Sequence, residues 1–137
     1  MEHLTHAEFV SALGEIRRVL SPRGQLIIHT APSLWYYRYG YPLYRLVQGL
    51  RRKRLPVNPR DRWGYSDVHI NEQTYLMLRR TLSAHGFHAK VWLTATQNYE
   101  HEPNAIIRLA MHFVSRVFPL QLVFADEIVA IAKPCAF

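Results

Sequence analysis

The residues with the clearest chemical potential are cationic and aromatic side chains interleaved between positions 34 and 64. Eight of the 17 Lys and Arg residues lie in this window and only Asp61 opposes them, so the window alone accounts for the net charge of +7. Its aromatic residues are Trp35, Tyr36, Tyr37, Tyr39, Tyr41, Tyr44 and Trp63. Such side chains can bind phosphate and stack on bases, or lie on an anionic membrane surface. The simpler interpretation is a solvated basic insertion whose aromatic side chains pack on the body of the domain.

Other kinds of site find little support in the sequence. The single cysteine, Cys135, excludes an internal disulfide and a zinc site built from cysteines. His85 and His88 straddle Gly86 without an accompanying Asp or Glu cluster, so we predict no metal site. No apolar run approaches the roughly 20 residues that a membrane span needs, and the first residues lack the order of a signal peptide. We therefore expect a cytoplasmic protein.

In the first half of the chain, the spacing of apolar residues predicts one helix, one strand and a second, short helix. Thr5 and Glu8 form a capping box, and apolar residues at helical spacing continue this helix to position 20. A Ser-Pro-Arg-Gly turn at 21–24 ends it, and residues 25–30 are expected to form a strand buried on both faces. The short helix within the window would precede the cations at 51–54 and carry Leu43, Leu46, Val47 and Leu50.

In the second half, Asn71 is the expected N-cap of a helix that ends before Gly86. Residues 87–95 alternate in polarity, which predicts a strand with one buried face near the sheet edge. Pro103 would begin a helix that continues to Pro119, and residues 122–132 would form a strand bent at Asp126. Alternating helices and strands predict one α/β domain whose sheet is covered on both faces.

The order of several motifs resembles class I S-adenosylmethionine-dependent methyltransferases of the type 11 kind. Glu2–Leu4 resembles the tripeptide after that family's fourth strand, and Leu20–Gly24 resembles the Leu-Lys-Pro-Gly-Gly-type turn before its fifth. His69–Asn71 resembles the family's substrate-side loop. Asp126–Pro134 resembles its final antiparallel strand, which inserts beside the fifth. The match spans nearly all of the chain, and the order and spacing of the motifs carry it.

The resemblance implies a partial Rossmann-like fold with a sheet of about three strands, the family's fifth to seventh, flanked by helices and with the last strand antiparallel. It covers only the second half of the family's fold. The first half holds S-adenosylmethionine, through a glycine-rich loop and an acidic residue that ends the second strand. The six glycines of this chain are all at least nine residues apart, so the loop is absent and we predict no cofactor-binding residues.

The resemblance also suggests site residues at the ligand-binding edge of the sheet. Glu2 and His3 would be catalytic, because a histidine there could act as general base toward a hydroxyl or amine acceptor. The substrate-binding candidates are His29, Thr30, His69 and Asn71, with Tyr36 and Arg38 from the insertion. Structural roles are the alternative: Glu2 and His3 could shape the turn into the helix, His69 and Asn71 could cap the next one, and His29 and Thr30 could simply pack.

Two hypotheses follow. In the first, residues 1–137 form a single incomplete methyltransferase-like domain with a basic aromatic insertion at 34–66, inactive alone because the cofactor-binding half is missing. A misassigned gene start, a gene remnant, or a half that needs a partner or a second copy would each explain this, and the small-molecule acceptor stays open. In the second, the chain is a non-enzymatic module whose segment 34–64 binds nucleic acid or an anionic membrane surface. The second predicts binding that weakens steeply with salt.

Overall fold

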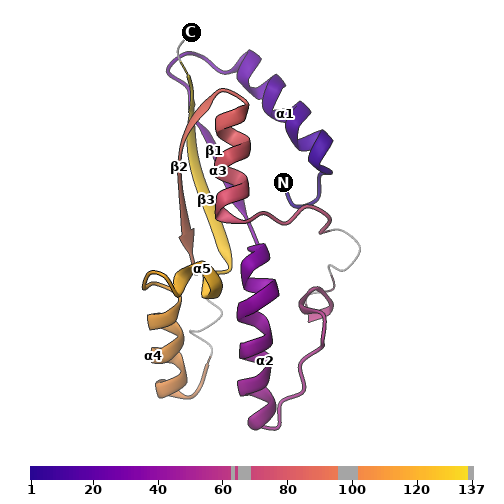
Figure 1. Ribbon diagram of the computed structural model, residues 1–137, viewed down its shortest axis with the longest axis vertical. Helices are drawn as coiled ribbons and strands as arrows, with labels where there is room; N and C mark the ends of the chain where they lie inside the picture. The colour runs from indigo at the N-terminus through magenta and orange to yellow at the C-terminus, as the bar shows by residue number, and fades with distance from the viewer. Residues whose placement is uncertain (63, 65–68, 96–101, 136–137) are drawn as a thin grey trace.

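A three-stranded sheet forms one end of an elongated molecule, and two helices project from the other end (Figure 1). The computed structural model describes residues 1–62, 64, 69–95 and 102–135. Trp63 and positions 65 and 66 of the predicted insertion lie outside the described residues.

The sheet has the order β1-β3-β2, with β1 at Leu26–Thr30, β2 at Phe87–Thr94 and β3 at Glu127–Pro134. The last strand lies in the middle and runs antiparallel to both neighbours, with Leu26 opposite Ala132 and Phe87 opposite Pro134. The outer strands β1 and β2 therefore run parallel to each other. The predicted mixture of helices and strands, with about three strands and an antiparallel last strand, is confirmed.

One face of this sheet is covered by α1 (His6–Val19) and α3 (Tyr75–Ala84). The predicted capping box of α1 is present: Thr5 Oγ1 accepts from the Glu8 amide, and a Glu8 carboxylate oxygen accepts from the Thr5 amide at 2.8 Å. Both helices turn their apolar stripes toward the sheet. The core they form contains Phe9, Leu13, Ile28, Leu78, Leu82, Phe87, Val91, Ile128, Ala130 and Ala132.

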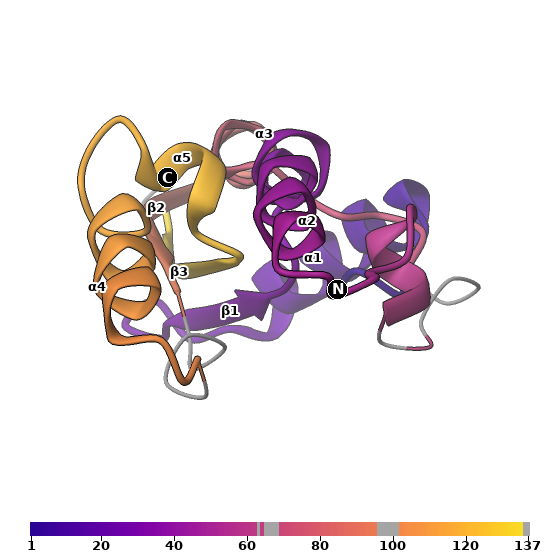
Figure 2. The ribbon, with the colours of Figure 1, turned by 90° about the horizontal axis from the view of Figure 1, so that it is seen from below.

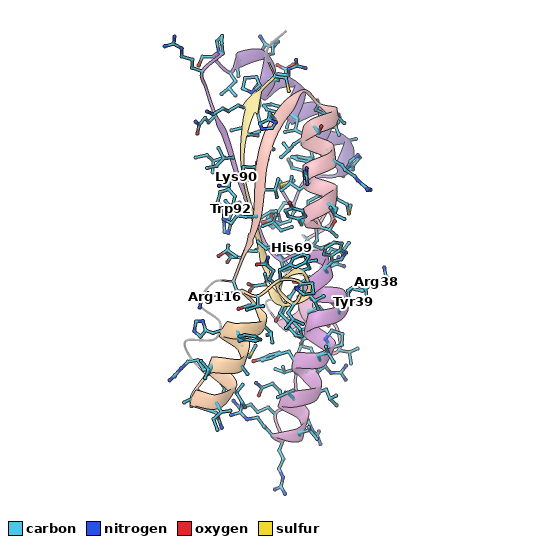
Figure 3. The ribbon with its side chains drawn as sticks, turned by 60° about the vertical axis from the view of Figure 1, so that its left-hand side comes forward. Arg38, Tyr39, His69, Lys90, Trp92 and Arg116 are labelled. Atoms are coloured by element: carbon cyan, nitrogen blue, oxygen red, sulfur yellow. The ribbon has the colours of Figure 1, made fainter. Side chains whose placement is uncertain are left out.

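The opposite face of the sheet is bare in the part of the chain that the structure describes. The prediction that residues 25–30 are buried on both faces is wrong: Ile27 is 68% exposed, because both packed helices lie on the other side of β1. Lys90 and Trp92 of β2 also project from the bare face, away from α3 (Figure 3). The predicted one-sided character of β2 is confirmed, whereas the expected cover on both faces is not found.

The helical end consists of a π-helical turn, η1 (Tyr36–Gly40), that leads directly into α2 (Tyr41–Leu50), and of α4 (Ala105–Val114) followed by α5 (Gln121–Phe124). A short 3-10 turn, η2, covers Pro59–Arg62. Gly40 permits the close contact of η1 with α5, since a Cβ there would clash with the Val123 carbonyl oxygen. No helix among the described residues has both the length and the hydropathy to cross a bilayer.

Two predictions about this end are wrong. The helix near Pro103 begins after Asn104, whose Oδ1 accepts from the Ile106 amide at 3.0 Å, and it ends at Val114 rather than at Pro119. Residues 121–124 form a helical turn instead of the first part of a strand, with the Phe124 amide 3.0 Å from the Leu120 carbonyl oxygen. A short apolar run does not distinguish these two structures by periodicity.

Candidate functional site

A polar cluster lies where β1 ends. Thr30, the last residue of β1, donates its hydroxyl to Glu2 Oε2 at 2.8 Å. The Glu2 carbonyl oxygen accepts from the amides of Ile70 at 3.0 Å and Asn71 at 3.1 Å. The start of the chain, the end of β1 and the segment before α3 therefore converge. This brings together the predicted site residues Glu2, His3, Thr30, His69 and Asn71.

Two histidines from distant parts of the sequence meet in this cluster. The rings of His3 and His69 make an edge contact, with centroids 4.8 Å apart. His69 is buried at the junction between the sheet and the lower helices (Figure 3), whereas the His3 side chain is 54% exposed. Burial, and then the neighbouring His3, lower the pKa of His69 below its usual value of 6.5, which favours a neutral ring at pH 7.

Glu2 supplies a negative charge beside His3. Burial opposes ionisation of this carboxyl, but hydrogen bonds from the backbone, from the Met1 ammonium at 3.0 Å and from Thr30, with the charge of that ammonium, outweigh burial and lower its pKa below 4.5. Glu2 Oε1 lies 3.6 Å from His3 Nε2. A carboxylate in this position can orient an imidazole. The exposed ring of His3 can therefore accept a proton from a molecule that approaches from solvent.

The same three side chains have the donor types of a transition-metal site. Glu2, His3 and His69 each offer one ligand atom, and these atoms lie within 4.8 Å of one another. Imidazole and carboxylate suit zinc, but ligand atoms around tetrahedral zinc lie only about 3.3 Å apart. The side chains would have to rotate to hold a metal. In the sequence His85 and His88 have a spacing that suggests metal ligands, whereas the grouping of Glu2, His3 and His69 arises only in the fold.

The sequence predicted Asn71 as the N-cap of α3, and this prediction is wrong. Thr74 has this role, since its Oγ1 accepts from the Met77 amide at 3.0 Å. The Asn71 Oδ1 instead accepts from Gln73 Nε2 at 2.8 Å. Asn71 therefore stays within the polar cluster, one turn away from the helix it was expected to begin.

A second polar centre joins the insertion to the segment before α3. The Arg60 guanidinium binds the Glu72 carboxylate through two hydrogen bonds of 2.6 and 2.5 Å, and the Glu72 side chain is only 4% exposed. Burial, and then the Glu72 charge, raise the pKa of the neighbouring Tyr37 to about 12. Sequence reasoning did not identify Glu72.

The remaining predicted site residues lie apart from the cluster. His29 precedes Thr30 on β1 and so faces the bare side of the sheet, where its Nε2 lies 3.0 Å from Glu127 Oε2. Tyr36 is buried in an aromatic cluster with Tyr37 and Tyr41. Arg38 is exposed, with its guanidinium carbon 5.7 Å from the Tyr39 ring centroid, and both project outward and away from His69 (Figure 3).

The cluster at the end of β1 thus combines an exposed imidazole, a carboxyl group and a buried imidazole, and the pKa values of the last two are lowered. These groups suit proton transfer to and from a small polar molecule. Comparison of the chain with protein-family models and with curated proteins found no match.

Proposed function

We propose that the chain is the C-terminal portion of a class I S-adenosylmethionine-dependent methyltransferase, with the cofactor-binding half supplied from elsewhere. The observation that carries the proposal is the position of β3. This last strand inserts beside β1 and runs antiparallel to it. The resemblance implies the same arrangement for the family's fifth and final strands.

The free edge of β1 supports the proposal that further strands complete the sheet. Among the described residues no strand pairs with the edge of β1 opposite β3. An apolar groove of about 240 Å³ follows this edge between β1 and α1, and Phe9, Leu13, Leu26 and Ile27 are among its lining residues. Exposed apolar sheet edges are avoided in natural proteins because they promote aggregation. Further strands on this side would cover both the groove and the exposed Ile27.

The residues of this chain do not fit S-adenosylmethionine. No glycine-rich loop is present, and two of the backbone amides after β1 already have acceptors. The Ser33 amide donates to the Asp126 carbonyl oxygen at 2.6 Å, and the Leu34 amide donates to that of Gln73 at 3.0 Å. The cofactor, which supplies the methyl group in this family, must therefore be held by the missing half.

The part of the enzyme formed by this chain would accept a proton from the methyl acceptor. Thr30 and the backbone amides of Ile70 and Asn71 hold Glu2 at the end of β1, and Glu2 lies beside His3. His3 would then accept the proton of a hydroxyl or amine on the acceptor. The buried, neutral His69 limits the orientation of the His3 ring.

Calorimetric titration of the 137-residue chain with S-adenosylmethionine tests the proposed incompleteness. We expect no measurable binding, and micromolar binding would overturn this part of the proposal.

The gene offers a second test of the proposed incompleteness. The DNA upstream of the start codon should encode an in-frame glycine-rich segment about 70 to 100 residues before Met1, the length of two or three βα units.

The longer protein encoded together with this upstream segment tests the methyltransferase assignment itself, because it should bind the cofactor and transfer its methyl group. In that protein His3→Ala should lower the rate about 10²- to 10⁴-fold, as expected for a lost general base. His6→Ala is the matched control, since His6 is exposed at the start of α1, and it should leave the rate unchanged. A longer product that does not bind S-adenosylmethionine would refute the assignment.

A further inference from the structure

The apolar face of α2 points toward solvent. Four apolar residues recur at helical spacing on this helix, and all are exposed: Leu43 by 51%, Leu46 by 62%, Val47 by 42% and Leu50 by 81%. The buried residues of α2 are Tyr41 and the polar Gln48. An amphipathic helix of a globular protein normally has the opposite orientation, with its apolar stripe in the core.

The neighbouring helix α4 has the same character. None of its ten residues is buried, and Ile106, Leu109 and Phe113 are 80%, 71% and 59% exposed. The two helices project side by side from the end of the molecule opposite the sheet, as two perpendicular views show (Figures 1 and 2). This end therefore presents two adjacent helices with uncovered apolar side chains.

Grooves continue this apolar surface on both sides of α2. The groove between the two helices has a volume of about 240 Å³ and no charged residue in its lining, which includes Leu43 and Val47 of α2 and Ile107 and Met111 of α4. The groove on the other side has a volume of about 600 Å³. Its lining combines Leu46, Leu50 and Leu55 with Arg45, Lys53 and Arg54, and contains no acid.

The cations beside α2 are available to a partner. Arg51 is paired with Glu102 at 2.9 Å, which ties the end of α2 to the start of α4. Arg45, Lys53 and Arg54 form no salt bridge within the part of the chain that the structure describes. Exposed apolar side chains bordered by unpaired cations match a surface with an apolar interior and anionic groups at its boundary.

We propose that this end, formed by α2, α4 and the cations Arg45, Lys53 and Arg54, docks on the surface of a lipid bilayer that contains anionic lipids. Each helix has only ten residues, so they would lie in the headgroup region rather than cross the bilayer. Nucleic acid fits less well. Tyr36, Tyr37 and Tyr41, which could have stacked on bases, are buried.

Sedimentation of the 137-residue chain with lipid vesicles tests this proposal. The vesicles would contain phosphatidylcholine alone or with about 30% phosphatidylglycerol. We expect binding to the anionic vesicles that is at least about tenfold stronger than to the neutral ones, and that weakens as salt is raised. The measurement needs no cofactor, so its result is independent of the proposed methyltransferase function.

Two double variants separate the apolar contribution from the charged one. Leu46→Gln with Leu50→Gln, and Lys53→Gln with Arg54→Gln, should each weaken binding to anionic vesicles by about tenfold or more. The matched charge control is Arg79→Gln with Arg80→Gln, on the exposed side of α3, and the matched apolar control is Val19→Gln, 67% exposed on α1. Neither control should change binding. Circular dichroism would verify that every variant is folded.

Several outcomes would overturn the proposal. Absence of binding to anionic vesicles, or equal binding to both kinds of vesicle, would remove the basis for it. Dimerisation that the Leu46→Gln and Leu50→Gln pair abolishes, without vesicle binding, would assign the surface to a second copy of the chain. Binding of an oligonucleotide that displaces the chain from vesicles and requires Lys53 and Arg54 would assign it to nucleic acid.

Discussion

The two ends of this molecule use the same kind of helix in opposite ways. At the sheet end, α1 and α3 direct their apolar stripes inward and bury residues such as Leu13 and Leu82 completely. At the helical end, α2 and α4 expose theirs and are linked instead by the Arg51–Glu102 salt bridge. An apolar stripe thus shows which face of a helix needs cover, but whether the chain itself supplies that cover depends on what the fold places opposite.

This contrast predicts that truncating a leucine has very different consequences at the two ends. Leu82 is 0% exposed, so Leu82→Ala should lower the free energy of unfolding by about 2–5 kcal/mol through lost burial and a cavity. Leu50 is 81% exposed, and Leu50→Ala should change the free energy of unfolding by less than about 0.5 kcal/mol. Urea denaturation of the two variants measures both values. Equal losses would mean that the leucines of α2 are covered in the isolated chain.

The next largest effect concerns the polar link between the insertion and the segment before α3. Arg60→Ala removes two hydrogen bonds from the buried Glu72 carboxylate and should cost about 1–3 kcal/mol of unfolding free energy. The control is Arg18→Ala, which removes a salt bridge of 2.9 Å to Glu15 between side chains 69% and 66% exposed. That change should cost less than about 0.5 kcal/mol. Similar losses of unfolding free energy for Arg60→Ala and Arg18→Ala, measured by urea denaturation, would show that burial of Glu72 does not strengthen its salt bridge with Arg60.

A smaller effect tests the start of α3. Thr74→Ala removes the acceptor of the Met77 amide and should cost about 1 kcal/mol, whereas Thr74→Ser keeps the hydroxyl and should cost much less. Hydrogen exchange gives a local readout, because the Met77 amide should exchange faster only in the Ala variant. Unchanged exchange at Met77 would place the effective cap elsewhere.

Local signals were sufficient for some elements and insufficient for others. The capping box of α1 involves Thr5 and Glu8, three positions apart, and the sequence predicted it correctly. Before α3 the sequence predicted Asn71 as the N-cap, whereas Thr74 has this role, because the N-cap depends on where the core fixes the first turn. Likewise, the short apolar run at 122–124 is compatible with helix or strand, and its contact with Gly40 exists only in the fold.

The candidate site shows the same limit. His29 and Thr30 are neighbours on one strand, so strand alternation alone implies that only one of them can face the cluster. The bond from Thr30 to Glu2 selects Thr30, and it depends on the path of the first residues across the sheet. The meeting of His3 with His69 depends on the same path, which no periodicity describes.

The last prediction returns to the helical end and concerns pH. The hydrogen bond from Arg51 lowers the pKa of Glu102 from 4.5 to about 2. Because the folded state depresses this pKa, the stability from the pair is present above about pH 4.5 and is lost as the pH falls toward 2. The difference in urea midpoint between the native chain and Glu102→Gln should therefore shrink through this range.

The matched control for this pH series is Glu15→Gln, on the exposed pair of α1, for which the difference in midpoint should stay small at every pH. If the difference in urea midpoint between the native chain and Glu102→Gln stayed constant as the pH falls, Arg51 would not favour the Glu102 carboxylate in the folded state. The core at the sheet end consists of apolar residues without titratable groups. Loss of the Glu102 contribution in acid should therefore loosen the attachment of α2 to α4 first, because their tips are joined by a charge pair rather than by shared burial.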